Sequence, residues 1–243
     1  MKSFLITKIC LLFLVISVNS YGFEKDIFKT SKGDLAITFV GHGTLMMEFD
    51  GKVIHIDPVA SFADYKTLPK ADLILITHAH GDHLDVKTID LIKKENTEIV
   101  MAPVCEGKYE GIKILKIGES GTFAGLKIDA VAAYNIQNVR GDGNPFHPKG
   151  EGVGFVIQFG DKKVYVAGDT ENIPEMKNLK AIDIAFLPMN LPYTMTPKMV
   201  ADAAKLFNPK ILYPYHFGDT DTNELVELMK NRKDVEVRIR KLN

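Results

Sequence analysis

Histidines and aspartates are concentrated in one short stretch of the chain, THAHGDHLD, at residues 77–85. His78 and His80 are two residues apart, so in an extended segment their side chains point the same way and can hold one ion together. Asp82 and His83 follow where the chain turns toward a helix, and they can face a neighbouring ion. Imidazole and carboxylate ligands suit a borderline cation such as Zn²⁺, whereas the absence of cysteine from this stretch disfavours a thiolate site. The stretch therefore predicts a metal site.

Two more candidate ligands stand immediately beyond apolar runs elsewhere in the chain. KVYVAGDT leads to Asp169 and KILYPYHFGD leads to His216, just as the run at 73–76 leads to the histidine-rich stretch. Side chains at the carboxyl ends of strands can converge on one crevice. The two oxygens of a carboxylate would allow Asp169 to bridge a pair of ions. We expect these residues to meet the 77–85 stretch in one cleft, where Gly81 allows a turn that a side chain would obstruct.

The elements that must position these residues are predicted from the hydrophobic periodicity. The run 72–77 is apolar on both faces, as a fully buried strand requires. A helix from 86 to 94 follows, with Asp85 as its N-cap. Other strands are expected at 34–40, 45–49 and 52–57 as an antiparallel meander, and then at 98–101, 112–116, 126–132, 153–159, 163–167, 182–187, 210–214 and 234–239; other helices are expected at 172–179, 196–206 and 222–230. Two sheets packed face to face, with helices outside, would bury these apolar strands.

The composition indicates which partners to expect. The chain has 243 residues, of which 46% are hydrophobic and 25% charged, as is ordinary for a globular protein. Its formal net charge of −1 provides no overall field that would attract a polyanion or an anionic membrane. We therefore expect a small-molecule substrate rather than nucleic acid or a lipid surface as the main partner.

The first 22 residues have the layout of a secretory signal. Lys2 and Lys8 both precede the apolar core Ile9–Val18. This core is too short to span a bilayer comfortably, although an uncleaved N-terminal anchor is the alternative. We expect a signal peptide at 1–22, one folded domain at 23–243, and a periplasmic or secreted mature protein without stable membrane insertion.

The cysteines predict a core without disulfide bonds. Cys10 lies inside the expected signal, which leaves Cys105 as the single cysteine of the mature chain. A chain with one cysteine has no intrachain disulfide, so packing must supply its stability. For Cys105 a small buried residue is preferred over a nucleophile.

Four residues near the motifs could support the site or form part of the ordinary packing. Asp57 shares one face of VIHID with His55 and could hydrogen-bond a ligating imidazole, which would fix its tautomer. His55 itself is expected to be a partly buried strand residue. Tyr193 and Met195 in LPYTM could form a wall of the substrate pocket or pack as ordinary loop residues.

Three motifs, THAHGDHLD, GDT and YPYHFG, occur in the order and spacing of the metallo-β-lactamase superfamily, which this chain resembles. The stretches FVGHGTLMMEF, IDP, AYN, FHPKGEGVGFVI, YVAGDTENIPEM and LPYTM, with the final HFG, are similar to a branch of metal-dependent hydrolases related to the ascorbate-phosphate lactonases and, more distantly, to the N-acyl-phosphatidylethanolamine phospholipases. The resemblance covers about residues 34–220. It implies an α/β protein, a four-layer αβ/βα sandwich of two mixed sheets flanked by helices, and one or two metal ions, with zinc expected and Mn²⁺ or Fe²⁺ as other options.

The resemblance also implies roles for individual residues. The implied ligands are His78 and His80 for the first ion, Asp82, His83 and His216 for the second, and Asp169 as the bridge. A further histidine usually follows the strand at 126–132, where this chain has Asn135. Either His147 of FHPKG completes the first site or that site is weak, and we prefer His147. Asn135, Tyr193 and His42 are the expected substrate-binding residues, although His42 in GHGT could instead be a turn histidine packed under the meander.

The implied activity is hydrolysis by a metal-bound hydroxide. A suitable metal lowers the pKa of its bound water towards ~7 and neutralises charge that develops on the substrate oxygen. Asp82 would orient the hydroxide and shuttle its proton. We therefore expect a metal-dependent hydrolase that cleaves an ester, lactone or phosphodiester of a small molecule.

Three other functions are weighed against this one. Hydrolysis of β-lactams is disfavoured because the closer likeness is to the lactonase branch. A non-catalytic metal-binding module on the same fold would have a structural zinc closed by four protein ligands, and it would not need both Asp82 and Asp169. An oxygen-reducing diiron protein is disfavoured by His80, where an acid would suit iron better.

Overall fold

The computed structural model describes residues 17–18 and 22–242. The expected signal segment, residues 1–22, therefore lies outside the described residues except for 17–18 and 22. Within the described part of the chain, no helix is both long enough and apolar enough to cross a membrane.

The first sheet contains eight strands in the order of the sequence, from β1 to β8. Neighbours from β1 to β5 pair antiparallel, and neighbours from β5 to β8 pair parallel. The central strand β6 is buried along its whole length, which explains its unbroken apolar sequence. The bounds are β1 (Ser17–Val18), β2 (Glu24–Thr30), β3 (Gly33–Gly41), β4 (Thr44–Phe49), β5 (Lys52–Ile56), β6 (Leu73–Ile76), β7 (Glu98–Met101) and β8 (Lys113–Ile114).

The second sheet repeats this plan with seven strands. Its order is β15-β14-β13-β12-β11-β10-β9, with antiparallel pairs from β9 to β12 and parallel pairs from β12 to β15. In both sheets an antiparallel meander is followed by strands that need crossovers. The bounds are β9 (Ser120–Phe123), β10 (Leu126–Ala133), β11 (Gly152–Phe159), β12 (Lys162–Val166), β13 (Ile184–Pro188), β14 (Ile211–Tyr215) and β15 (Glu236–Val237).

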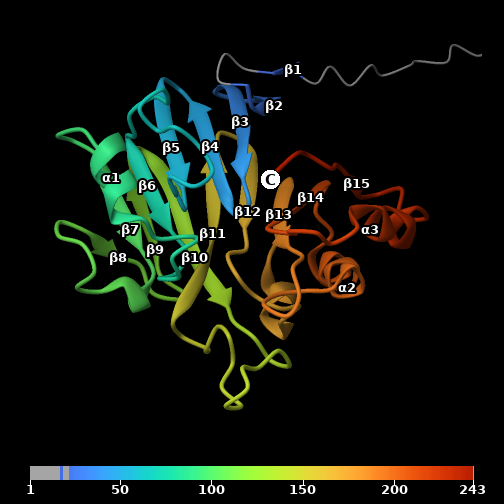
Figure 1. Cartoon of the computed structure of the whole chain (residues 1–243). Helices are drawn as coiled ribbons and strands as arrows, with labels where there is room; N and C mark the ends of the chain where they lie inside the picture. Colours follow the sequence, from blue (N-terminus) through green and yellow to red (C-terminus); the bar gives the residue numbers. More distant parts are fainter. Residues whose placement is uncertain (1–16, 19–21, 243) are drawn as a thin grey trace, which may run out of the picture.

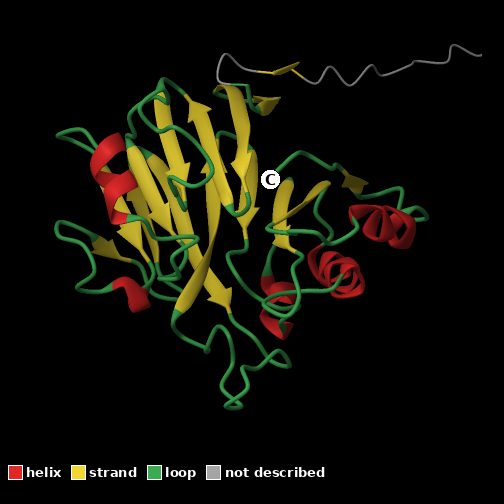
Figure 2. Cartoon of the chain, in the orientation of Figure 1, coloured by secondary structure: helices red, strands yellow, loops and turns green. Residues whose placement is uncertain are grey.

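The two sheets pack face to face between helices, so the molecule has four layers (Figures 1 and 2). Side chains such as Ile37 of the first sheet and Phe155 of the second belong to the same apolar core. Helix α1 (Val86–Ile92) packs on the first sheet through Ile89 and Ile92. The second sheet is covered by α2 (Pro197–Phe207), α3 (Thr222–Met229) and the 3₁₀ helix η2 (Pro174–Asn178). The predicted αβ/βα sandwich of two mixed sheets is confirmed.

The local elements differ from the prediction in a few places. The helix expected at 172–179 is the five-residue 3₁₀ helix η2, closed by hydrogen bonds from Met176 N to Ile173 O and from Leu179 N to Met176 O. Strands β2 and β9 and the short 3₁₀ helix η1 (Pro103–Cys105) were not predicted. Cys105 is fully buried, as expected, and burial raises the pKa of its thiol to about 12.

His55 lies on β5 and is fully buried rather than partly buried as predicted. Its Nε2 is 3.0 Å from the carbonyl oxygen of Pro69, and its Nδ1 has no hydrogen-bond partner among the residues that the structure describes. Burial outweighs the hydrogen bond to Pro69 and lowers the pKa of His55 to about 4. The unfolded chain, with a pKa near ~6.5, therefore binds a proton more readily than the folded protein does between these two values.

This shift predicts an acid-sensitive contribution to stability. The stability that neutral His55 contributes is fully present above pH ~6.5 and is lost as the pH falls towards 4. The free energy of unfolding should therefore fall by about 2 kcal/mol between pH 7.5 and 4.5 because of this residue. We expect metal-free His55→Gln to lose less stability than the metal-free wild type over this interval, by about that amount, in urea unfolding at the two pH values. The other histidines titrate in both proteins, so their effects on stability cancel in the comparison. Equal losses in the two proteins would contradict the assignment.

Candidate metal centre

The predicted site residues meet at one edge of the sandwich, where strands of both sheets end. Strand β6 leads directly into the stretch that holds His78, β12 is followed by Asp169, and β14 is followed by His216. From the first sheet, β5 also ends at this edge and is followed by Asp57. Because parallel neighbours end at the same edge of a sheet, side chains that are far apart in the sequence come together here.

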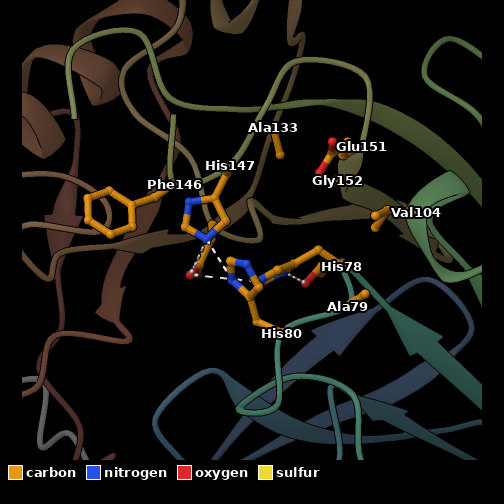
Figure 3. A pocket seen from close by; sticks show the side chains of 11 residues that line it. His78, Ala79, His80, Val104, Ala133, Phe146, His147, Glu151 and Gly152 are labelled. Carbon is orange, nitrogen blue, oxygen red and sulfur yellow. Dashed lines mark hydrogen bonds and ion pairs between the residues drawn. The ribbon is translucent and has the colours of Figure 1, made fainter. Parts of the chain in front are cut away.

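The first group of ligand atoms belongs to His78, His80 and His147, whose candidate nitrogens all lie within 4.8 Å of one another. His147 Nε2 is 3.2 Å from His80 Nδ1, and the ring of His147 lies edge-on to that of His78 at 5.0 Å between centroids. The structure thus brings His147 to this group, as we preferred. Figure 3 shows the rings of His80 and His147 side by side in the pocket.

The second group contains His42, Asp82, His83 and His216. Asp82 Oδ2 lies 3.2 Å from His42 Nε2, 3.4 Å from His216 Nε2 and 3.8 Å from His83 Nε2. The rings of His42 and His216 are only 3.7 Å apart between centroids. Of the two interpretations of His42, the structure favours the one that places it beside the other candidate ligands.

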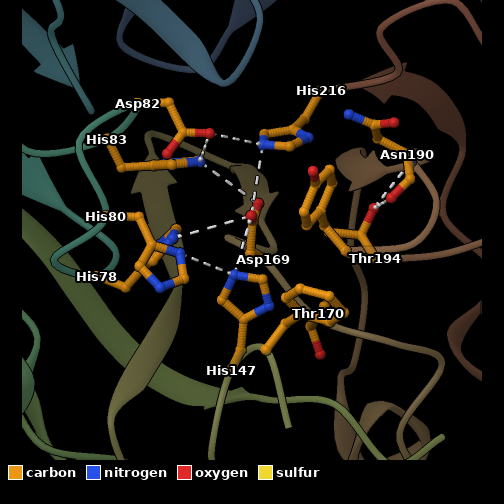
Figure 4. A network of polar contacts seen from close by, with 12 residues as sticks. His78, His80, Asp82, His83, His147, Asp169, Thr170, Asn190, Thr194 and His216 are labelled. Carbon is orange, nitrogen blue, oxygen red and sulfur yellow. Dashed lines mark hydrogen bonds and ion pairs between the residues drawn. The ribbon is translucent and has the colours of Figure 1, made fainter. Parts of the chain in front are cut away.

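Asp169 lies between the two groups (Figure 4). Its Oδ2 is 3.2 Å from His147 Nε2 and 3.4 Å from His216 Nε2, and its Oδ1 is 3.5 Å from His83 Nε2. A carboxylate in this position can contact an ion in either group. The geometry expected of a bridge is therefore present.

Several ligand atoms of the site are buried and have no hydrogen-bond partner within the described part of the chain. These atoms are the Nε2 atoms of His78, His83 and His216 and the Oδ1 atom of Asp169. Leaving a buried polar atom unsatisfied costs about 1–3 kcal/mol. Divalent cations would satisfy all four atoms, and the nitrogen and carboxylate donors are those that zinc prefers. The residues present fit one or two such ions.

The charges of these residues shift one another's pKa values. Burial disfavours the ionised form of Asp169, but the positive charges of His216 and His83 outweigh it and hold the pKa of Asp169 well below its usual range. Burial also disfavours charge on His83, yet the carboxylates of Asp169 and Asp57 raise the pKa of His83 to about 9. For His78, burial and the charge on His83 lower the pKa well below its ordinary value. Cations and protons compete for the same lone pairs, so metal binding strengthens as the pH rises.

Asp57 supports one candidate ligand, His83, at the ring nitrogen that faces away from the metal site, as the sequence suggested. Its Oδ2 is 2.8 Å from His83 Nδ1, which directs Nε2 of that ring toward the site. Asp57 also accepts hydrogen bonds from the backbone N–H of Thr77 at 2.8 Å and from Thr77 Oγ1 at 2.6 Å. Thr77 Oγ1 in turn lies 3.0 Å from His78 Nδ1. One buried carboxylate therefore orients two imidazoles, and the part played by Thr77 was not predicted.

Replacing Asp57 by asparagine is expected to weaken zinc binding by about 10–100-fold, the usual effect of losing such a support. Asparagine has the same shape and tolerates the left-handed backbone of this position, where φ is 46°. Competition with a fluorescent chelator measures the affinity. Asp72→Asn is the matched control, because Asp72 lies at the start of β6 and pairs with Lys94, away from the site. An unchanged affinity in Asp57→Asn would contradict this role.

The backbone is strained at the site. His42, Asp57 and His216 all have left-handed φ values, 50°, 46° and 47° respectively, although none is glycine. Such conformations cost about 1–3 kcal/mol each and persist only when the surrounding structure holds them. Here the hydrogen bonds from His42 N to Leu242 O, from Asp57 N to Leu75 O and from His216 N to His42 O hold all three.

Asn135 has a different role from the predicted substrate contact. Its Oδ1 accepts hydrogen bonds from the backbone N–H of His147 at 2.8 Å and from His147 Nδ1 at 2.7 Å. Its Nδ2 donates to Glu171 Oε1 and to the carbonyl oxygen of Tyr193. All of its polar atoms are thus used inside the protein, and they aim Nε2 of His147 at the first group.

Glu171 is a supporting residue that the motifs did not reveal. Its fully buried carboxylate accepts hydrogen bonds from the backbone N–H groups of Ile136, Gln137 and Asn138. It therefore fixes the conformation of the first residues of the loop that carries His147. The only sequence signal was its position two residues after Asp169.

The predictions for Tyr193, Met195 and Gly81 had different outcomes. Tyr193 is 44% exposed and lines a pocket of about 250 Å³ beside the ligand groups, together with Phe146, against which its ring packs edge-on at 5.1 Å. Met195 is fully buried in the core under α2, so it is no pocket wall. The expectation for Gly81 was wrong, because a Cβ atom there would meet nothing within 4 Å and its φ is not left-handed.

Comparisons with known proteins agree with the fold. A family model described as "Beta-lactamase superfamily domain" matches residues 36–216. A UPF0173 metal-dependent hydrolase of Methanopyrus kandleri is 32% identical over 201 residues, which cover 76% of this chain and 84% of the relative. Another, from Bacillus cereus, is 32% identical over 215 residues and covers 81% and 94% of the two chains.

Solved structures are also similar. A Parabacteroides distasonis protein described as a metal-dependent hydrolase has 50% sequence identity and a TM-score of 0.87, and the match covers 91% of this chain and all of that one, 100%. A metallo hydrolase of the archaeon Ignicoccus hospitalis has 26% identity and a TM-score of 0.70 over 86% of this chain and 96% of its own. A diiron β-hydroxylase of Streptomyces venezuelae, at 16% identity, shares the fold alone.

Proposed function

Because the chain belongs to the metallo-β-lactamase superfamily and to its UPF0173 metal-dependent hydrolases, we propose that it hydrolyses an ester, lactone or phosphodiester of a small molecule with one or two bound Zn²⁺ ions. One observation carries the proposal. Asp169 stands within 3.5 Å of histidine nitrogens from both groups of ligand atoms. A single structural ion would not require two such groups around a shared carboxylate.

The proposed ligands follow the two groups. His78, His80 and His147 would hold one ion, and Asp82, His83 and His216 of the second group would hold the other, with Asp169 close to both groups and His42 left for the substrate. When bound, zinc would supply a Lewis acid that lowers the pKa of water towards ~7 and stabilises negative charge on the substrate oxygen. The protein does not need a nucleophilic side chain for this chemistry.

Asp82 is the proposed catalytic residue. Its side chain is 45% exposed, whereas that of Asp169 is 3% exposed, so Asp82 is the carboxylate that a water or substrate can reach. His42 and His216 both contact its Oδ2 and keep the carboxylate ionised, because they hold the pKa of Asp82 well below its ordinary range despite burial. The free Oδ1 can hydrogen-bond the attacking water and orient it, whereas a pKa held this low makes Asp82 too weak a base to take up the proton at neutral pH.

The partly exposed Asp82 also favours an enzyme over a non-catalytic metal-binding module. A structural zinc site is closed by its protein ligands, whereas the pocket beside Asp82 is open and extends to Tyr193. The histidines of the first group suit zinc better than the acid-rich sets that suit iron.

Metal analysis followed by a substrate panel tests the proposal. We expect purified protein to contain zinc, and a chelator to abolish hydrolysis of one class among p-nitrophenyl esters, simple lactones and bis(p-nitrophenyl) phosphate, with activity restored by added zinc. Hydrolysis of a chromogenic cephalosporin alone would support the β-lactam alternative. Zinc-loaded protein that cleaves none of these compounds would instead support the non-catalytic module.

A further inference from the structure

Arg140 is a cation at the mouth of the pocket that has no role in the proposed reaction so far. It lies in the loop between β10 and β11, and its Nη2 is 3.4 Å from His80 Nε2 and 3.0 Å from the carbonyl oxygen of Phe146. Its guanidinium carbon stands over the ring of Phe146, 5.1 Å from the centroid. Among the described residues it forms no ion pair with a carboxylate. Hydrogen bonds from Asn144 lower the pKa of the nearby Asp142, and the charge of Arg140 adds to this effect without a direct ion pair. Stacking thus holds a guanidinium with free donors beside a candidate ligand.

If His80 binds a metal ion, its Nε2 becomes a hydrogen-bond donor and can no longer accept a hydrogen bond from Arg140. His80 Nδ1 faces His147 Nε2 at 3.2 Å, so Nδ1 is the atom directed at the ligand group. An imidazole that gives its Nδ1 lone pair to a cation carries its hydrogen on Nε2. Nε2–H and the guanidinium N–H groups are then two donors 3.4 Å apart with no acceptor between them. An oxygen atom that accepts from both would satisfy the pair.

The acidic side chains Asp142 and Glu151 near the pocket do not form ion pairs with Arg140 among the described residues. Asp142, in the same loop as Arg140, is engaged by hydrogen bonds from the backbone and side chain of Asn144, both at 3.0 Å. Glu151 lines an adjoining lobe with His80 and Phe146. Figure 3 shows Glu151 and Phe146 on opposite sides of His147, so this acid lies away from the ring on which Arg140 stacks.

We propose that Arg140 and the Nε2–H of His80 together bind an anionic oxygen of the substrate, on a carboxylate or phosphate group separate from the bond that is cleaved. This inference rests on the proposed function and narrows its substrates to anionic ones. Arginine suits such a role because its planar guanidinium offers paired donors to carboxylate and phosphate oxygens. The group that is hydrolysed lies over the metal centre, and the second, anionic group reaches toward Phe146.

Equilibrium binding tests the inference without requiring turnover. Isothermal titration of the zinc-loaded protein compares acetate, which has one anionic group for the metal centre, with succinate and 3-phosphonopropionate, which have a second one. We expect at least one of the two longer probes to bind about tenfold or more tightly than acetate, the size of one charged hydrogen bond. The probe that gains more identifies the carboxylate or the phosphate as the preferred group.

Arg140→Gln should abolish this advantage and leave acetate binding unchanged. Lys149→Gln is the matched control, because Lys149 is an exposed cation of the same loop whose ammonium pairs with Glu175 at 2.7 Å. The inference is overturned if neither longer probe gains over acetate in the wild type, if Arg140→Gln keeps the advantage, or if Lys149→Gln loses it equally. Since no hydrolysis is measured, a protein that cleaves nothing would contradict the proposed function and leave this result unaffected.

Discussion

Asp169→Ala is expected to lower the zinc content of the protein to less than half of the wild-type value and to reduce turnover on the order of 10³-fold or more. The carboxylate contacts histidines of both ligand groups and is almost wholly buried, so nothing else can replace it as a shared ligand. Loss of a metal ion removes several kcal/mol of transition-state stabilisation, and each 1.36 kcal/mol is about tenfold in rate. The readouts are metal analysis after gel filtration and the rate on the best compound of the substrate panel.

Asp161→Ala is the matched control for this experiment. Asp161 lies in the turn before β12, at the opposite end of this strand from Asp169, and pairs with Lys162. We expect this variant to keep full zinc content and activity. Thermal unfolding of metal-free samples shows whether either variant has lost its fold. If Asp169→Ala is folded and retains the full complement of zinc, the two-group arrangement proposed for the metal centre is incorrect.

The parts of the site that could be predicted are those fixed by strands. His78, Asp169 and His216 follow apolar runs, and a buried parallel strand delivers the residue after it to a known edge of the sheet. Asp57 was predictable for the same reason, since it directly follows β5 beside β6. In these cases the local pattern and the global fold specify the same position.

The position of His147 could not be derived in this way. It lies in the loop between β10 and β11, and the conformation of this loop depends on hydrogen bonds from residues 136–138 to Glu171, more than thirty positions away. Such a contact leaves no periodicity in the sequence. The same is true of Asn135, whose roles as substrate contact and as support for a histidine look identical until the partners of its amide are known.

The unpredicted strand β2 illustrates a limit of hydrophobic periodicity. Its sequence EKDIFKT is mostly polar, and its inward residue Asp26 is buried by ion pairing with Arg240, at 2.7 Å, rather than by apolar packing. A pattern search for alternating apolar residues misses a strand of this kind. The partner of Asp26 is more than two hundred residues away, so only the folded chain reveals why the strand forms.

Gly43→Ala is expected to reduce zinc affinity and kcat/KM by about 10²-fold each, although alanine adds a single methyl group. A Cβ atom at this position would lie 2.7 Å from His83 Cε1, 3.3 Å from His83 Nδ1 and 3.5 Å from His216 Cδ2. The ring of His83 cannot retreat freely, because it is fully buried and Asp57 holds its Nδ1 at 2.8 Å. It must shift or break this hydrogen bond, and a displacement of about 1 Å at a reacting centre can cost 10²-fold in rate.

Gly81→Ala provides a control inside the histidine motif itself. A Cβ atom at position 81 meets nothing within 4 Å and needs no left-handed backbone, so zinc affinity and activity should stay within about threefold of the wild type. The histidine motif by itself suggests the opposite order, because Gly81 lies between candidate ligands of one short stretch and Gly43 does not. Measured zinc affinities therefore separate the two arguments: a strong loss in Gly81→Ala with a mild one in Gly43→Ala would show that the close approach of Gly43 to His83 does not control the metal centre.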